Sequence, residues 1–316
     1  MTRKITASAP GSVMLMGEHA VVKGYWAVAC ALDKNISVTL TPRADREVLI
    51  RSELATYQAS LDDLSIDDRL SFVLKAIQLQ LSELTRGFEL DISAEFSHTL
   101  GLGSSAAVTV ATVKVLAEYT HQSLSRAEHL KKSLAVVHGV QKRGSGTDLA
   151  ASIYGGVIAY KVDPCEVIPL SGLPIICLHY VGYKTKTPEV LSIVAQKAKR
   201  HPHIYRDIYK MMDSVTCAAI NAIKDEDWQG FGELMNIYQG QMDSLGVSDA
   251  KLCEIIYSLR KDSRIQGAKI SGSGLGDCVI SLGAEIELEG FQQIKLTVAK
   301  TGISLTESES KGESND

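Results

Sequence analysis

The sequence predicts an α+β protein in which helices pack on one side of a set of strands. Polar and apolar residues alternate strictly over 35–41 and 88–94, a pattern typical of half-buried strands. Between these segments, residues 67–84 repeat apolar side chains at helical spacing. Two more helical patterns cover 106–119 and 125–140. Strand patterns return later in the chain, so the order of elements favours a layered α+β sandwich.

Turn-forming residues divide the chain into two parts. A strand pattern at 157–160 is followed by turn signals between 162 and 172. We therefore predict a first domain over 1–168 and a second over 169–305. The second domain is expected to begin with a strand at 175–181. Its later elements are three helical patterns, two strands and a last helix, at 187–224, 227–243, 249–262, 267–271, 278–282 and 290–300.

Two local signals mark where elements end. Ser125 and Glu128 have the spacing of a capping box, so a helix is expected to begin just after Ser125. Residues 306–316 contain no apolar side chain. Such a segment cannot offset its ordering entropy by burial, and we expect a disordered tail there.

The composition excludes several classes of function. Of 316 residues, 45% are hydrophobic and 22% are charged, which is typical of a globular protein. The net charge of −4 gives no basic footprint for nucleic acid or for an anionic membrane. No apolar stretch approaches the roughly 18 residues that a membrane helix needs. We therefore expect no nucleic-acid partner and no membrane partner.

The cysteines indicate a reducing compartment. None of the six forms a Cys-x-x-Cys pair, so a zinc site is not expected. Most lie in apolar runs, as buried free thiols do. Since the N-terminus also lacks the pattern of a secretory signal, we expect a cytoplasmic location. A homodimer is compatible with the sequence, which does not decide the oligomeric state.

The strongest chemical signal is a glycine-serine loop between a predicted strand and a predicted helix. The loop reads Gly101-Leu102-Gly103-Ser104-Ser105-Ala106-Ala107. Glycines permit positive φ and close backbone approach, and consecutive amides at a helix start bind anions. The serine hydroxyls could bind a phosphate oxygen or Mg²⁺. Taken alone, the same residues could form a turn in which serine caps the helix.

Two more glycine-bearing motifs lie near the ends of the chain. The first reads Pro10-Gly11-Ser12-Val13-Met14-Leu15-Met16-Gly17-Glu18-His19-Ala20. It sets two ionisable side chains beside a glycine, although an isolated Glu-His pair is commonly exposed surface. The other reads Lys269-Ile270-Ser271-Gly272-Ser273-Gly274-Leu275-Gly276-Asp277-Cys278. Its three glycines exceed what a hairpin turn requires, which favours close approach of the backbone to a ligand.

In this order and at these separations, the three motifs resemble those of the GHMP kinases, which include galactokinase, homoserine kinase, mevalonate kinase and phosphomevalonate kinase. The resemblance runs from Ala9 to about Leu305. It implies a two-domain GHMP kinase fold, in which a nucleotide-binding N-terminal domain resembles domain 2 of ribosomal protein S5 and the C-terminal domain is ferredoxin-like. It also implies ATP and Mg²⁺ as cofactors.

The resemblance implies roles for individual residues. Residues 101–106 match the phosphate loop, and Ser105 matches the serine that binds Mg²⁺. Asp148 matches the catalytic aspartate, which would orient the alcohol and accept its proton, although a helix N-cap is the plain alternative. The residues that match the substrate-binding motifs are Ser12, Glu18, His19, Gly272, Ser273 and Gly274.

One departure from the family pattern concerns charge. The family commonly has lysine after Pro-Gly, beside the catalytic aspartate, where this chain has Ser12. Lys142, Arg143, Lys184 or Lys186 could replace that positive charge. We favour the 184–186 pair, because a cation from the second domain would arrive only when the domains close on substrate.

Two further departures concern the metal and the acceptor. Leu134 occupies the position where an acidic Mg²⁺ ligand is expected. Gln141 and the run Gly276-Asp277-Cys278 resemble phosphomevalonate kinases, whereas the run Gly17-Glu18-His19-Ala20 resembles mevalonate kinases.

The resemblance therefore implies an enzyme that transfers a phosphoryl group from ATP to the primary alcohol of mevalonate, a small-molecule partner. The alternatives are a phosphomevalonate kinase or another GHMP small-molecule or sugar kinase. A further alternative is a non-catalytic ligand sensor with the same fold. Ser12 favours the sensor, while Asp148 and Ser105 argue against it.

Overall fold

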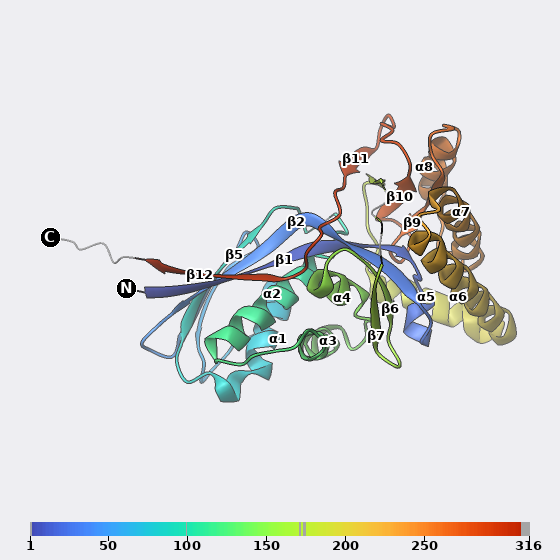
Figure 1. Ribbon diagram of the computed structural model, residues 1–316. Helices are drawn as coiled ribbons and strands as arrows, with labels where there is room; N and C mark the ends of the chain where they lie inside the picture. Colours follow the sequence, from blue (N-terminus) through green and yellow to red (C-terminus); the bar gives the residue numbers. More distant parts are fainter. Residues whose placement is uncertain (1, 99, 171, 173–174, 311–316) are drawn as a thin grey trace.

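The computed structural model describes residues 2–98, 100–170, 172 and 175–310 (Figure 1). Its first sheet has eight strands: β1 (Thr2–Met16), β2 (Ala27–Pro42), β3 (Glu47–Arg51), β4 (Thr56–Ser60), β5 (Phe88–Ala94), β6 (Val157–Lys161), β7 (Glu166–Leu170) and β12 (Ser304–Ser310). The order is β12-β1-β2-β5-β3-β4, and β6 pairs with both β2 and β7. The pairing of β3 with β5 is parallel, and the other pairs are antiparallel.

Helices cover one face of this sheet (Figure 1). They are α1 (Ser71–Leu79), α2 (Ser104–Tyr119), α3 (Arg126–Gln141) and α4 (Thr147–Tyr154). Both α2 and α4 pack directly on β1 and β2. Three short 3₁₀ turns complete the domain, η1 (Val21–Lys23), η2 (Asp68–Leu70) and η3 (Leu81–Glu83). The predicted capping box is confirmed, since the Ser125 and Glu128 side chains each bond to the other residue's backbone amide.

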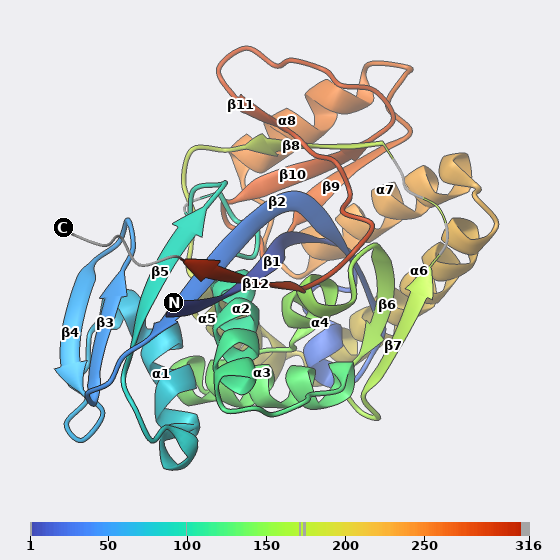
Figure 2. The ribbon, with the colours of Figure 1, turned by 60° about the vertical axis from the view of Figure 1, so that its left-hand side comes forward.

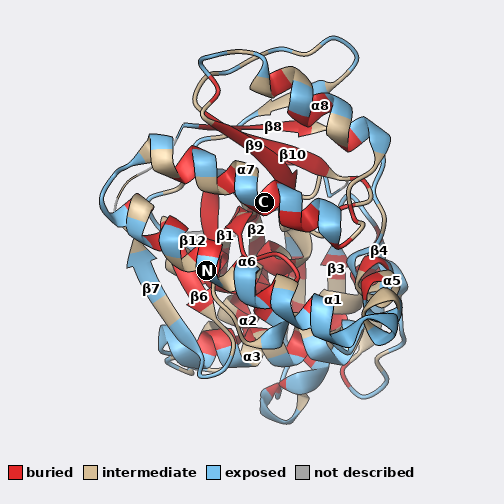
Figure 3. Cartoon of the chain, turned by 90° about the vertical axis from the view of Figure 1, so that its right-hand side faces the viewer, coloured by how far each residue is buried: buried red, intermediate tan, exposed pale blue. Residues whose placement is uncertain are grey.

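The second sheet has four antiparallel strands, β8 (Ile176–Tyr180), β9 (Gly267–Ser271), β10 (Cys278–Leu282) and β11 (Gln292–Lys295). The order is β11-β8-β10-β9 (Figure 2). The helices of this half are α5 (Thr187–Arg200), α6 (Pro202–Lys224), α7 (Trp228–Ser244) and α8 (Ala250–Arg260). Strands β9 and β10 are buried throughout, while α6 and α7 alternate buried and exposed positions (Figure 3). Within the described residues, no helix is both long and apolar enough to span a bilayer.

The predicted α+β architecture is confirmed, with differences in individual elements. The single helix predicted over 187–224 is two helices, which meet at His201-Pro202. Proline lacks an amide proton and disfavours helical backbone in the residue before it. The helix predicted over 290–300 is wrong. That segment contains β11, and its apolar residues Ile294, Leu296 and Val298 follow the alternation of extended chain.

The predicted tail is also wrong over the residues that the structure describes. Residues 304–310 form β12, which pairs antiparallel with β1 from Ser8↔Ser304 to Thr2↔Ser310. Backbone hydrogen bonds hold this edge strand without an apolar face, and Arg3 adds a two-pronged contact to the Glu307 carboxylate. The remainder of the predicted tail, 311–316, lies outside the described residues.

The pairing of β12 has a measurable consequence for stability. Deleting residues 307–316 is expected to reduce the free energy of unfolding by about 1–2 kcal/mol, since it removes ladder hydrogen bonds and one exposed ion pair. For a domain of this size the melting temperature should fall by about 2–8 °C. Thermal unfolding of the truncated and full-length chains measures the difference, and equal melting temperatures would contradict a stabilising β12.

The two sheets place the change of domain close to the predicted boundary. The first sheet continues to Leu170 in β7, and the second begins at Ile176 in β8. The predicted division after residue 168 therefore cuts β7. In addition, β12 returns the chain to the first sheet, so the N-terminal layer is built from both ends of the sequence (Figure 2).

Candidate active site

Ser12 lies where the pairing of β1 with β2 is irregular. The register shifts between Pro10 and Ser12, which marks a bulge in the ladder. The Ser12 amide donates to the carbonyl oxygen of Leu102 at 3.0 Å, and its side chain is buried. The bulge thus joins the first motif to the glycine-serine loop.

The glycine-serine loop enters α2 with left-handed backbone. Gly101 has φ +62° and Gly103 has φ +68°. A Cβ on Gly101 would lie 2.0 Å from Oδ1 of Asp277, and one on Gly103 would lie 2.2 Å from Oγ of Ser12. Glycine is favoured at both positions, because the backbone is left-handed and a Cβ would require the Asp277 or Ser12 side chain to move. The loop therefore packs between the first and third motifs, and its backbone amides lie at the N-terminus of α2.

Asp148 lies in the first turn of α4, half-buried beside Ser12. The Ser12 hydroxyl donates a hydrogen bond to Oδ1 of Asp148 at 2.9 Å. Burial raises the pKa of Asp148, and the negative charges of Asp277 and Glu18 raise it further. The hydrogen bond from Ser12 and the charge of Lys184 act in the opposite direction. A raised pKa moves the carboxylate toward the range useful for proton transfer near neutral pH.

Glu18 forms a buried ion pair between the two halves of the molecule. Nζ of Lys269, on β9, lies 2.5 Å from Oε1 of Glu18, and both side chains are inaccessible to solvent. Lys269 also lies over the ring of Tyr238 on α7, 5.4 Å from its centroid. The Tyr238 hydroxyl donates to the Glu18 carbonyl oxygen at 2.8 Å. Glu18 thus fastens the first motif to the second domain.

His19, next to Glu18 in the first motif, also connects this motif to the third one. Its Nε2 donates to the carbonyl oxygen of Ser273 at 2.9 Å. Burial lowers the pKa of His19, against the smaller effects of the Ser273 bond and the Glu18 charge, so the ring is neutral at neutral pH. Its Nδ1 has no hydrogen-bond partner within the described part of the chain. Because Nε2 carries the proton, this buried Nδ1 can accept a hydrogen bond from a donor group on a ligand.

A cavity of about 350 Å³ opens at the start of α2. Ser104, Ser105 and Lys184 line it beside the phosphate loop. Its other walls include the apolar side chains of Leu70, Phe72, Val73, Ile92, Phe96 and Val108. An apolar slot that ends at a glycine-serine loop and a lysine is suited to a planar base with a phosphate chain.

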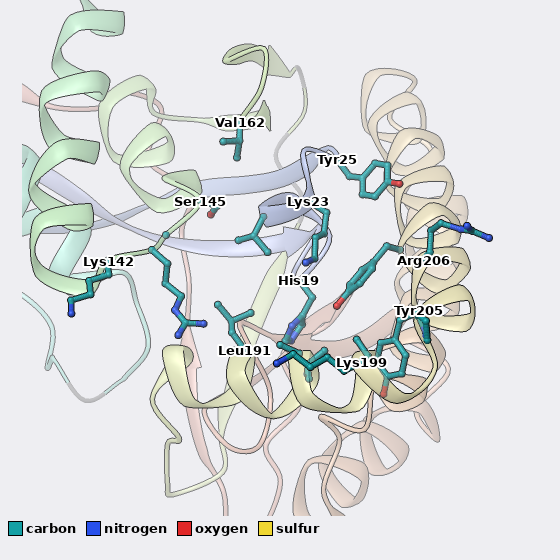
Figure 4. Close-up of a pocket in the computed structure, with 18 of the residues that line it drawn as sticks. His19, Lys23, Tyr25, Lys142, Ser145, Val162, Leu191, Lys199, Tyr205 and Arg206 are labelled. Carbon is teal, nitrogen blue, oxygen red and sulfur yellow. The ribbon is translucent and has the colours of Figure 1, made fainter.

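A larger cavity of about 760 Å³ lies on the other side of the first motif, between the α3–α4 connection and helices α5 and α6 (Figure 4). His19 lines it, with Ser145 on the connection that leads to Asp148. Among the described residues, its lining includes two histidines and five lysines or arginines and no Asp or Glu: His19, His138, Lys23, Lys142, Arg143, Lys199 and Arg206. In Figure 4 the side chains of Lys23 and Lys199 point toward His19, whereas Lys142 and Arg206 point away.

The structure brings together most of the residues predicted for the site. Ser12 contacts both the phosphate loop and Asp148, and Gly272, Ser273 and Gly274 form the turn whose Ser273 carbonyl accepts from His19. Of the predicted residues, His19 lines the larger cavity, and Ser104 and Ser105 line the smaller one. Ser12, Glu18 and Asp148 line neither cavity, and the Ala106 side chain is buried.

Several residues of the site were missed from the sequence. Lys269 stands as a lone charge in the apolar strand 267–271, a pattern that signals a buried partner. Lys23 and Lys199 carry no such signal, because each sits in a segment that also has ordinary surface residues.

The donor set fits a Mg²⁺ ion held mainly by phosphate. Among the described residues, no group of three or more His, Cys, Asp or Glu side chains could hold a metal alone. Ser104 and Ser105 line the smaller cavity. Asp277, against the loop, keeps one carboxylate oxygen without a partner in the described residues. Mg²⁺ commonly binds proteins through few side chains, retaining waters and phosphate oxygens.

Comparisons with known proteins agree with this geometry. The family model for the GHMP kinases N terminal domain matches residues 71–156, and that for the GHMP kinases C terminal domain matches 219–290. A galactokinase galactose-binding signature matches 2–42. The chain is 31% identical to a mevalonate kinase of Pyrococcus abyssi, over 97% of this chain and 99% of that protein. It is 32% identical to one of Methanothermobacter thermautotrophicus, over 88% of this chain and 90% of that one.

Solved structures show the same fold. The mevalonate kinase of Methanococcus jannaschii, 26% identical, superposes with a TM-score of 0.78 over 93% of this chain and 98% of its own. The galactokinase of Lactococcus lactis in complex with galactose has a TM-score of 0.82 over 95% of each chain; at 18% identity it supports the fold alone. With both family domains and full-length relatives above 30% identity, the chain is a kinase and belongs to the GHMP kinase family.

Proposed function

We propose that this kinase transfers the γ-phosphoryl group of ATP to the primary hydroxyl of mevalonate. The observation that carries the proposal is the position of Asp148. Its carboxylate is bonded to Ser12, against which the phosphate loop packs, and it follows Ser145 of the larger cavity by three residues. Asp148 lines neither cavity, but these links connect it to the loop beside the nucleotide cavity and to the wall of the cavity suited to an acceptor.

The residues divide the work of phosphoryl transfer between them. The loop amides and the start of α2 hold the phosphates by hydrogen bonds and the helix dipole. Mg²⁺, when bound, would neutralise phosphate charge, and the hydroxyl groups of Ser104 and Ser105 at the start of α2 would help to hold it. Asp148 orients the acceptor hydroxyl and takes its proton as the new O–P bond forms and the bond to the ADP oxygen breaks. Ser12 fixes the carboxylate by its hydrogen bond.

The acceptor is identified by an assay with several alcohols. Purified protein with Mg·ATP is offered mevalonate, 5-phosphomevalonate, galactose or homoserine, and ADP release and the phosphorylated product are measured. Mevalonate is expected to give the highest kcat/KM. The proposal is overturned if another alcohol is preferred, or if none is phosphorylated while mevalonate or another ligand still binds, as in a sensor.

One observation favours a second candidate, a phosphorylated acceptor such as 5-phosphomevalonate. In the part of the chain that the structure describes, the larger cavity is lined by basic residues and by no acidic one, and Lys23 and Lys199 point into it. Neither lysine forms an ion pair within the described residues, although Lys23 also lies 5.7 Å from the ring centre of Tyr209. Two unpaired cations suit a dianionic phosphate better than a single carboxylate. The same assay decides between the two acceptors.

Ser105 provides a separate prediction about the donor side. Ser105→Ala is expected to raise the KM for Mg·ATP by about 10-fold, the scale of one lost charged hydrogen bond. Folding should be almost unaffected, because the Ser105 contact within the protein uses its carbonyl, which accepts from Thr109. Initial rates over a range of ATP and Mg²⁺ measure the change. Wild-type dependence on both would show that Ser105 is only structural.

A further inference from the structure

Lys184 and Asp277 form an ion pair at the junction of the two domains. Nζ of Lys184 lies 2.8 Å from Oδ2 of Asp277. Lys184 follows β8, and Asp277 ends the third motif just before β10. The two segments are tied by backbone bonds as well, since the Asp277 amide donates to the Tyr183 carbonyl at 2.7 Å. The position of Lys184 is therefore fixed by the third motif.

This ion pair touches the phosphate loop. The other carboxylate oxygen of Asp277, Oδ1, lies against Gly101, where a Cβ would come within 2.0 Å of it. Lys184 itself lines the smaller cavity together with Ser104 and Ser105. Its side chain keeps 36% of its surface exposed, against 14% for Asp277. The ammonium group of Lys184 is thus held by the half-buried carboxylate of Asp277 and remains open to a ligand in the nucleotide cavity.

Charge balance around Asp148 requires such a cation. The charged groups that face Asp148 from other elements are Glu18 on the β1–η1 connection, Asp277 in the third motif, and Lys184. Glu18 is balanced by Lys269, while Ser12 contributes a hydrogen bond and no charge. Adding a triphosphate makes the site more negative still, and an uncompensated carboxylate there would be protonated and unable to act as a base.

The other candidate cations, Lys142, Arg143 and Lys186, do not line the nucleotide cavity beside the phosphate loop. Lys142 and Arg143 line the larger cavity, and Lys142 points away from its centre (Figure 4). Lys186 is exposed at the start of α5 and makes no ion pair among the described residues. Of the four basic residues near the motifs, Lys184 is the one placed in the nucleotide cavity.

We propose that Lys184, positioned by Asp277, binds the phosphates of the nucleotide and keeps Asp148 ionised, the charge role that a lysine at position 12 has elsewhere in the family. The pair with Asp277 holds the ammonium beside the loop before nucleotide binds. When phosphate enters the cavity, the exposed ammonium reaches it without leaving Asp277. The role of Lys184 in keeping Asp148 ionised rests on the proposed phosphotransferase activity. Its role in binding the nucleotide phosphates does not, because that binding needs no acceptor.

The test compares Lys184→Met with Lys186→Met, a matched control two residues away. Equilibrium binding of a non-hydrolysable Mg·ATP analogue is expected to weaken by about 10-fold or more in Lys184→Met, the scale of one charged contact, and to stay at the wild-type value in Lys186→Met. Lys184→Arg, which keeps the charge, should restore most of the affinity. Equal affinity in the wild type and Lys184→Met would overturn the phosphate-binding role.

The pH dependence of kcat tests the effect on Asp148. Lys184→Met should raise the apparent pKa of the acidic limb, because a positive charge is removed. Asp277→Asn should lower it, because a negative charge is removed, provided that Lys184 still occupies the cavity. A purely structural role would not move the two variants in opposite directions. An unchanged acidic limb in Lys184→Met refutes this role, whereas absence of transfer by the wild type to every alcohol refutes the proposed function and leaves the binding test intact.

Discussion

Asp148→Asn is expected to lower kcat at least ~100-fold, the usual scale for loss of a general base. The amide keeps the shape of the side chain, and its oxygen can still accept the hydrogen bond from Ser12. What is lost is the group that takes the proton from the acceptor hydroxyl. Binding of Mg·ATP should change little, because Asp148 does not line the smaller cavity. Steady-state kinetics with the preferred acceptor and direct nucleotide binding measure the two effects.

The stability of this variant separates catalysis from folding. Burial raises the pKa of Asp148, so the folded state favours the protonated form more than the unfolded state does. At neutral pH the ionised carboxylate therefore costs stability, and that cost disappears as the pH falls through the folded-state pKa. Asp148→Asn should consequently melt at the same temperature as the wild type or higher. The control is Asp33→Asn, at an exposed position, which should change neither kcat nor the melting temperature. Near-normal turnover in Asp148→Asn would contradict its role as base.

Lys269→Met is expected to have the largest effect on stability, a loss of about 3–5 kcal/mol. The substitution leaves the Glu18 carboxylate buried without its cation, and Oε2 of Glu18 already lacks a partner among the described residues. The contact over the Tyr238 ring also disappears. Chemical denaturation measures the loss. The exposed Lys261→Met is a matched control at the end of α8 and should unfold like the wild type.

A double variant tests whether the pair itself is responsible. Glu18→Gln combined with Lys269→Met removes both charges, so most of the lost stability should return. If the double variant is as unstable as the sum of the two single variants, the residues are not coupled and the loss comes from packing. Since the pair joins the first motif to β9, the single variants should also reduce activity by loosening the site.

The sequence was most informative where function depends on local backbone. The glycines of the 101–103 loop have positive φ and lie in close contact with other motifs, so their spacing in the sequence indicated a tight loop at the start of a helix. The start of α3 could be predicted for a similar reason, because Ser125 and Glu128 cap each other within one turn. In both cases the residues that form the feature are neighbours in the sequence.

Features that depend on distant partners could not be predicted. Glu18 and Lys269 are separated by 251 positions, and the sequence around each residue does not indicate that the other is its partner. The same holds for β12, whose polar residues are held by the backbone of β1 rather than by burial. The length of β1 was not apparent from the sequence, because Pro10 and Gly11 are typical of turns, whereas here they lie within the strand at a bulge. The choice among candidate cations likewise required the fold.

The most direct test of phosphoryl transfer to mevalonate is the stoichiometry of the reaction. Wild-type protein with Mg·ATP and limiting mevalonate is followed by ADP release and by phosphorus NMR of the product. One ADP should form for each mevalonate consumed, with the phosphoryl group on the primary hydroxyl and almost no ADP when mevalonate is absent. ADP release that is equal with and without mevalonate, or binding of mevalonate without any ADP, would contradict the proposed function.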